Sequence, residues 1–173
     1  MTEMTAYTDE SIRGNRYLMA VVVVDPGDGG GACRAKLRSQ AKAFKKRSLH
    51  FNDLVPAQRT QTMDLFCEFE GVRSYVFEHA RQRGEDLVAA RAVVLTAMIN
   101  RLQDERVALL VLDQWSGYRK DGEIIRRIQY RPRYDHSSFQ DEPLLWIADG
   151  IVHNAGVKQP LEFPSWHEGT TKV

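Results

Sequence analysis

The chain of 173 residues is long enough for one compact domain with a substantial core, and its 43% hydrophobic and 27% charged residues are typical of globular proteins. A formal net charge of +1 excludes a global field that attracts nucleic acid, so any basic surface must be local. The longest apolar run (17–24) is too short to span a bilayer, and no secretory signal or cysteine framework is present, so we expect a cytoplasmic protein.

The first third of the chain predicts three strands and a helix. Residues 4–11 and 16–24 flank a polar turn and should pair as a hairpin, and the continuous valines of the second strand imply burial on both faces. The glycines of 25–31 are not followed by Gly-Lys-Ser/Thr, so they predict a flexible turn rather than a phosphate-binding loop. A basic, exposed helix is expected over 32–47 and a short third strand over 48–51.

The rest of the chain alternates helices with strands. Helices are expected over 52–70 (starting near Pro56), 85–106, 119–128 and 142–156, strands over 72–80 and 107–114, and a polar loop over 129–141. This order predicts a single α/β domain over 1–173, with a core of about 5–156 and a C-terminal tail over 157–173. The sheet should be mixed and five-stranded, because the hairpin is antiparallel and strands joined by helices run parallel.

Three aspartates occupy positions that could bring them together. Asp9 and Asp113 are expected at strand ends, which border the ligand crevice of an open α/β sheet, and Asp149 lies at the edge of the apolar stripe of the last helix. Carboxylates gathered there would repel one another unless one took up a proton or a divalent cation bound, and oxygen ligands suit Mg²⁺ or Mn²⁺. Taken singly, each acid is better explained by a structural role. Asp9 and Asp113 would then belong to turns, and Asp149 would form an ion pair with Arg119 or Arg127.

Three short motifs resemble the ribonuclease-H-like superfamily. They are "YTDES" on the first strand, "LVLDQ" on the late strand and "EPLLWIAD" on the last helix. The chain looks closest to a bacterial and phage branch that begins with Asp-Glu-Ser and ends with an Ala-Asp helix. The resemblance implies a ribonuclease-H-like fold in which Asp9, Asp113 and Asp149 hold Mg²⁺ or Mn²⁺ for phosphodiester hydrolysis.

The resemblance also implies a fourth acid, which the sequence does not single out. Glu10 is one candidate for this catalytic position, although on a regular strand it points away from Asp9 and needs a bulge or a turn to join the site. Glu68 and Glu70 are the others, near the end of their helix.

A nucleic-acid partner, RNA or DNA, would need local basic surface. Two clusters suit a phosphate backbone, 42–47 and 126–133, although charge runs are usually only solvated surface. The candidate contacts are Lys45, Lys46, Arg47 and Arg131 in these clusters, and His136 and Ser137 in the loop before the last helix.

Three further side chains have an open role. His50 could act as a proton shuttle in the crevice or lie half-exposed in the third strand. Trp115 could stack a base or cap the core. Trp146 falls away from the main apolar stripe of its helix and could meet a further helix or the second subunit of a homodimer.

Two functions therefore remain open. The first is a nuclease that cleaves phosphodiester bonds by a two-metal mechanism on the three aspartates. The alternative is a non-catalytic binding or assembly module that retains the fold, and a toxin or phage-defence component would differ from either only in its biological setting.

Overall fold

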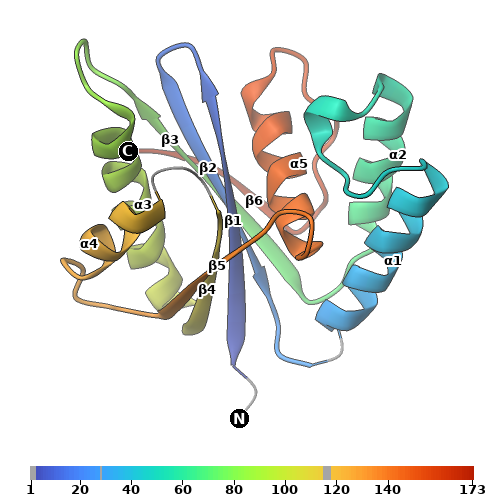
Figure 1. The fold of residues 1–173 in the computed structure, drawn as a ribbon, viewed down its shortest axis with the longest axis horizontal. Coiled ribbons are helices and arrows are strands. Elements are labelled where there is room, and N and C mark those ends of the chain that lie inside the picture. Colours follow the sequence, from blue (N-terminus) through green and yellow to red (C-terminus); the bar gives the residue numbers. More distant parts are fainter. Residues whose placement is uncertain (1–2, 28, 115–117) are drawn as a thin grey trace.

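The structure is a computed structural model that describes residues 3–27, 29–114 and 118–173 (Figure 1). Its elements, in chain order, are β1 (Met4–Arg13), β2 (Arg16–Val24), α1 (Gly29–Ala43), η1 (Phe51–Asp53), α2 (Pro56–Cys67), β3 (Val72–Ala80), α3 (Leu87–Asp104), β4 (Val107–Asp113), η2 (Tyr118–Lys120), α4 (Asp121–Ile125), β5 (Arg133–Ser137), α5 (Leu144–Gly156) and β6 (His167–Lys172), where η marks a 3-10 helix.

The strands form one mixed sheet in the order β5-β4-β1-β2-β3-β6. β2 runs antiparallel to both of its neighbours, and the other adjacent pairs are parallel. The predicted hairpin is therefore present, and its register pairs Asp9 with Ala20 without a bulge. β1 extends two residues beyond its predicted end, because pairing with β2 continues as far as Arg13 and Arg16.

The sheet has six strands rather than five, and the prediction was wrong at three segments. Residues 48–51 form no strand, because β2 and β3 pair directly and leave no edge for them. The predicted loop contains β5, and the predicted tail contains β6, which pairs with β3. Both missed strands lie at sheet edges and are largely solvent-exposed, so they lack the apolar alternation by which strands are recognised.

Helices cover both faces of the sheet (Figure 1). α1, α2 and α5 pack on one face with Leu18 and Val22, and α3 and α4 pack on the other with Val21 and Val23. The expectation that the valines of β2 are buried on both faces is confirmed. α1 starts at Gly29, inside the glycine run predicted as a turn. None of the helices within the described parts of the chain is both long and apolar enough to cross a membrane.

α5 is buried on nearly all sides, because the sheet covers one face and η1, α1 and α2 lie on the other (Figure 1). Trp146 is only 1% exposed, and its indole N–H donates to the backbone oxygen of Phe139 at 2.5 Å. The expectation that Trp146 meets a second subunit was therefore wrong, because the segment before α5 covers it. The structure gives no support for a homodimer.

Gly150 allows α5 to approach η1 and α2 closely. A Cβ at this position would lie 2.6 Å from ring carbons of both Phe51 and Phe66, which are packed in the core. We expect Gly150→Ala to lower the free energy of unfolding by about 1–3 kcal/mol, because buried rings would have to move. Urea denaturation measures this change. In the control Gly29→Ala, the added Cβ meets only a backbone oxygen at 3.7 Å, so no loss is expected; equal losses would contradict the packing argument.

Candidate active site

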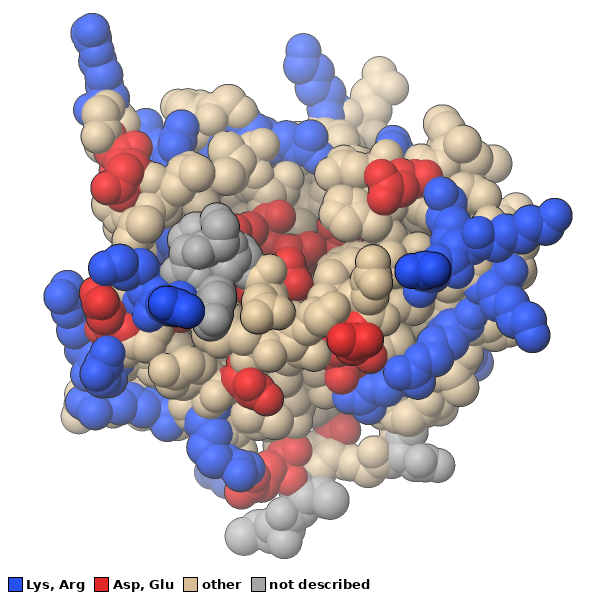
Figure 2. Space-filling view, in the orientation of Figure 1, with Lys and Arg blue, Asp and Glu red and all other residues tan. Residues whose placement is uncertain are grey.

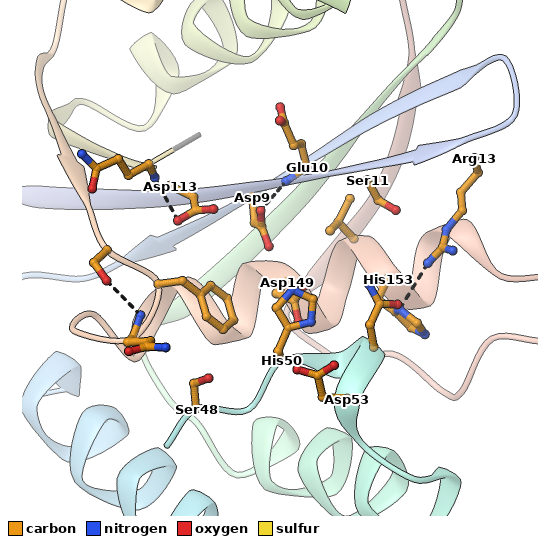
Figure 3. Close-up of a pocket in the computed structure, with 16 residues that line it drawn as sticks. Asp9, Glu10, Ser11, Arg13, Ser48, His50, Asp53, Asp113, Asp149 and His153 are labelled. Atoms are coloured by element: carbon orange, nitrogen blue, oxygen red, sulfur yellow. Dashed lines mark hydrogen bonds and ion pairs between the residues drawn. The ribbon is translucent and has the colours of Figure 1, made fainter. Parts of the chain in front are cut away.

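A cleft of about 500 Å³ opens between β1, the end of β4, α5 and the segment before α2. Figure 2 shows a hollow on this face with acidic side chains at its floor, while Lys and Arg side chains gather toward the periphery of the molecule. Asp9, Asp113 and Asp149 all line the cleft (Figure 3). The tertiary structure therefore brings together three acids that are far apart in the sequence.

Strand register explains how two of these acids become neighbours. Thr8 pairs with Leu112 in the parallel β1–β4 ladder, so Asp9 and Asp113 follow at the same level. β4 ends at Asp113, whereas β1 continues to Arg13. The prediction that Asp9 ends its strand was wrong, but Asp9 does lie where the neighbouring strand ends. Asp149 arrives from α5, which packs against β1.

Each of the three carboxyl groups accepts a hydrogen bond from a backbone N–H. The donor to Asp9 is Glu10 at 2.8 Å, and the donor to Asp113 is Gln114 at 2.9 Å. Asp149 accepts from Phe51 at 2.7 Å, a contact that depends on the close approach allowed by Gly150. One oxygen of each carboxyl group is thereby held, which limits side-chain rotation.

Burial raises the pKa of all three acids, and neighbouring carboxylates add to the shift at Asp9 and Asp113. Burial raises the pKa of Asp9 well above its usual range, and the negative charges of Asp149 and Asp113 add to the shift. Burial also raises the pKa of Asp113 and that of Asp149, while the nearby His50 ring opposes the shift at Asp149. Ionised carboxylates in this cleft therefore repel one another, and a bound proton or cation would relieve the repulsion.

The donor chemistry suits a hard cation, because the three acids offer carboxylate oxygens and Mg²⁺ and Mn²⁺ prefer oxygen ligands. Within residues 3–27, 29–114 and 118–173, however, no group of three or more His, Cys, Asp or Glu side chains is already placed to hold a metal ion. Asp9, Asp113 and Asp149 are the residues that could hold one, and their carboxyl groups would have to turn toward a common point.

Glu10 is among the residues that line the cleft, but its side chain points to the other side of β1 from Asp9 (Figure 3). Its carboxylate contacts the Tyr17 hydroxyl and the Arg91 guanidinium. Arg91 in turn forms two hydrogen bonds with Asp121, at 2.7 and 2.9 Å, in the core between the sheet and α4. The bulge that Glu10 would need to join the aspartates is absent, because the described β1–β2 register is continuous.

Two histidines border the cleft. His50 is 38% exposed, and its Nε2 lies 3.9 Å from Asp149 Oδ1. It belongs to a loop rather than to a third strand. His153 was missed by the sequence argument, although it follows Asp149 by one helical turn and so lies on the same face of α5. Burial and the neighbouring charges of Arg59, Arg13 and His50 lower the pKa of His153 to about 4, so it is neutral at neutral pH.

The same spacing rule could have found two more lining residues. Ser11 and Arg13 follow Asp9 at every second position of β1, and successive odd positions of a strand share a face. Arg13 donates a hydrogen bond to His153 Nδ1 at 3.2 Å, because a guanidinium group has donors but no acceptor. Ser48 and Asp53, from the loop and η1, also line the cleft and had no recognisable sequence signal.

The six predicted nucleic-acid contacts do not line this cleft. Lys45, Lys46 and Arg47 follow the end of α1, and Arg131 is exposed before β5, with its Nε donating to the Ile128 oxygen at 2.9 Å. Their contact with nucleic acid stays a prediction.

The other two of these residues belong to β5. The His136 ring lies 2.9 Å from Asp121 and so joins the Arg91 network. The Ser137 backbone oxygen accepts from Gln114 at 3.2 Å. Glu68 and Glu70 are exposed residues after α2 and do not line the cleft, and Trp115 lies outside the described residues.

The strand order and the placement of the helices define a ribonuclease-H-like fold, as solved structures bear out. Ribonuclease H2 from Pyrococcus horikoshii matches with a TM-score of 0.59 and 16% identity over 87% of this chain and 70% of that chain. Ribonuclease HII from Archaeoglobus fulgidus, in complex with PCNA, matches with a TM-score of 0.60 and 16% identity over 86% of this chain and 69% of that chain.

A third neighbour, Bst ribonuclease HIII in complex with Mn²⁺, matches with a TM-score of 0.58 and 11% identity over 88% of this chain and 51% of that chain. This chain therefore spans about half the length of that enzyme. No protein-family model matches the chain, and no curated protein matches it by sequence. The similarity to these ribonucleases is one of fold.

Proposed function

We propose that the chain is a nuclease that hydrolyses phosphodiester bonds with Mg²⁺ or Mn²⁺ held by Asp9, Asp113 and Asp149. The observation that carries the proposal is the convergence of these three carboxyl groups, from β1, β4 and α5, on one cleft of a ribonuclease-H-like fold. Membership of the bacterial and phage branch with an N-terminal Asp-Glu-Ser belongs to the same proposal.

The aspartates would hold the cations, and their raised pKa values support this role. Burial disfavours the ionised form of all three carboxyl groups, and the charges of neighbouring acids add to this at Asp9 and Asp113. Binding of a cation would therefore relieve a repulsion that the folded chain otherwise carries. Bound divalent cations would supply an activated water and neutralise charge on the leaving oxygen.

His50 is placed to move a proton at the edge of the cleft. Its Nε2 faces Asp149 at 3.9 Å, and its ring packs against Phe139 with centroids 5.1 Å apart. The ring is thereby held beside the aspartates while its exposed side reaches solvent. We propose that His50 exchanges a proton between the reacting groups and bulk water.

Cleavage assays test the proposal. Labelled single-stranded, duplex and hybrid substrates are incubated with Mn²⁺ and either the wild type or Asp113→Asn. Loss of a ligand should lower the rate at least about a hundredfold, because even residues that support metal ligands cost ten- to a hundredfold when replaced. Asp64→Asn, an exposed change on α2, is the matched control and should keep full activity. Equal rates in wild type and Asp113→Asn would contradict the assignment.

A non-catalytic binding or assembly module is the second candidate, a toxin or phage-defence component included. It is favoured by one observation: within the described ranges no set of donors is already arranged around a metal position. Mn²⁺ separates the two candidates, since a ligand that binds only the folded state raises its melting temperature. We expect Mn²⁺ to stabilise the wild type and not Asp113→Asn, whereas a module of the second kind would respond to Mn²⁺ in neither form.

A further inference from the structure

A second cleft, of about 460 Å³, adjoins the active-site cleft. It lies between the start of α2 and the C-terminal end of α5, which Figure 1 shows side by side with η1. His153 lines both clefts, and Phe51, which lines the second, directly precedes Asn52 and Asp53 in the wall of the first. A chain that occupies the first cleft can therefore continue into the second past His153.

The two clefts carry opposite charge. The first contains Asp9, Asp113 and Asp149, whereas the second is lined by Arg59 and Lys158 and by no acidic residue among those described. Arg59 is oriented by its Nε, which donates to the Phe51 backbone oxygen at 2.8 Å. Within the described residues neither Arg59 nor Lys158 forms an ion pair with an acid, so both charges remain available to an anion.

The remaining walls of the second cleft are apolar and held in place. Pro56, Val157 and Leu161 contribute apolar surface. Asn154 fixes the loop that carries Leu161, because its amide donates to the Leu161 oxygen at 2.9 Å and accepts from the Leu161 N–H at 2.7 Å. Apolar walls with two cations offer the two contacts that an unpaired nucleotide uses: apolar surface for the base and positive charge for the phosphate.

We propose that the second cleft holds an unpaired nucleotide of the substrate strand beside the bond cleaved in the first. This inference rests on the proposed nuclease function and adds a substrate class to it: nucleic acid with a single-stranded segment next to the cleavage point. A base can enter such a groove only if it leaves the stack, and the energetic cost is least where the strand is already unpaired.

Binding of matched probes tests the inference in an Asp113→Asn background with Mg²⁺, so that the probes are not cleaved. The probes are a blunt duplex, the same duplex with a 5′ tail or a 3′ tail of three nucleotides, and the free single strand, each as DNA and RNA. Fluorescence anisotropy gives the dissociation constants. One of the two tails should tighten binding about tenfold, the effect of placing one base on a protein surface.

Two variants place the effect in the second cleft. Lys158→Glu reverses an exposed charge, and Thr60→Phe fills the groove from an exposed position on α2. Both should abolish the gain from the tail and leave binding of the blunt duplex within about twofold, because that duplex does not reach the groove. Lys172→Glu, the same charge reversal on the edge strand β6, should retain the gain.

The outcomes separate this inference from the nuclease proposal. A gain that survives both Lys158→Glu and Thr60→Phe, or no gain from either tail, overturns the second cleft as a nucleotide site while duplex binding and cleavage stand. If Lys172→Glu also abolished the gain in affinity, the gain would reflect general charge attraction. That result too would overturn the second cleft as a nucleotide site. If sedimentation showed that the wild type is a dimer and that Thr60→Phe is a monomer, the groove would be the contact with a second copy of the chain, and the inference would be overturned. No binding of any probe would overturn both proposals.

Discussion

Asp9→Asn should make the metal-free protein more stable while it removes the proposed activity. The pKa of Asp9 is raised by burial and by the charges of Asp149 and Asp113, so the ionised carboxylate destabilises the folded state at neutral pH. An amide of the same shape lacks that charge. We expect the free energy of unfolding to rise by about 1–2 kcal/mol, as is common when a strained functional site is relaxed, measured by urea denaturation in chelator.

The pH dependence of this gain follows from the sign of the shift. A carboxyl group with a raised pKa in the folded state binds a proton more readily there than in the unfolded chain. Wild-type stability should therefore recover as the pH falls and Asp9 becomes protonated, and the advantage of Asp9→Asn should shrink. Mn²⁺ should reverse the order by stabilising only the wild type. The exposed control Asp64→Asn should show neither effect. A less stable Asp9→Asn protein at neutral pH would instead identify Asp9 as a structural ion-pair partner.

Arg91→Met should cost much more stability than any exposed charge change in this chain. Arg91 is 3% exposed and lies between Asp121, which is fully buried, and the carboxylate of Glu10. Removal of the guanidinium takes away the cation that lies between the buried carboxylate of Asp121 and the partly exposed carboxylate of Glu10. We expect a loss of about 3–5 kcal/mol, typical of a buried ion pair broken from one side. The change in the urea midpoint at an unchanged slope measures it.

Lys120→Met is the control, because its ion pair with Glu123 is exposed on both sides and should contribute less than about 1 kcal/mol. A double-mutant cycle with Asp121→Asn isolates the coupling between Arg91 and Asp121. A loss below 1 kcal/mol in Arg91→Met would show that water reaches this network. The result bears on the cleft, because Glu10 directly follows Asp9 and fixes the opposite side of the same strand segment.

The buried elements of this chain could be predicted because their patterns are local. The valine run of β2 and the apolar stripe of α5 reveal burial through spacing alone. β5 and β6 could not be recognised in the same way, since edge strands gain their hydrogen bonds from a neighbour and need no apolar side chains. Residues 48–51 resembled a strand because Leu49 and Phe51 are buried, but they pack under α5 instead of pairing.

The amino-acid sequence by itself determined which three aspartates are candidates, because each interrupts or ends an apolar pattern. Only the tertiary structure decided that their carboxyl groups share a cleft, through the β1–β4 register and the packing of α5 on β1. It also decided that Glu10 faces Arg91 and that His50 and His153 border the acids. The physical reason is that burial patterns depend on the spacing of residues close together in the sequence. The partner of a charged side chain instead depends on distant segments that meet only after folding.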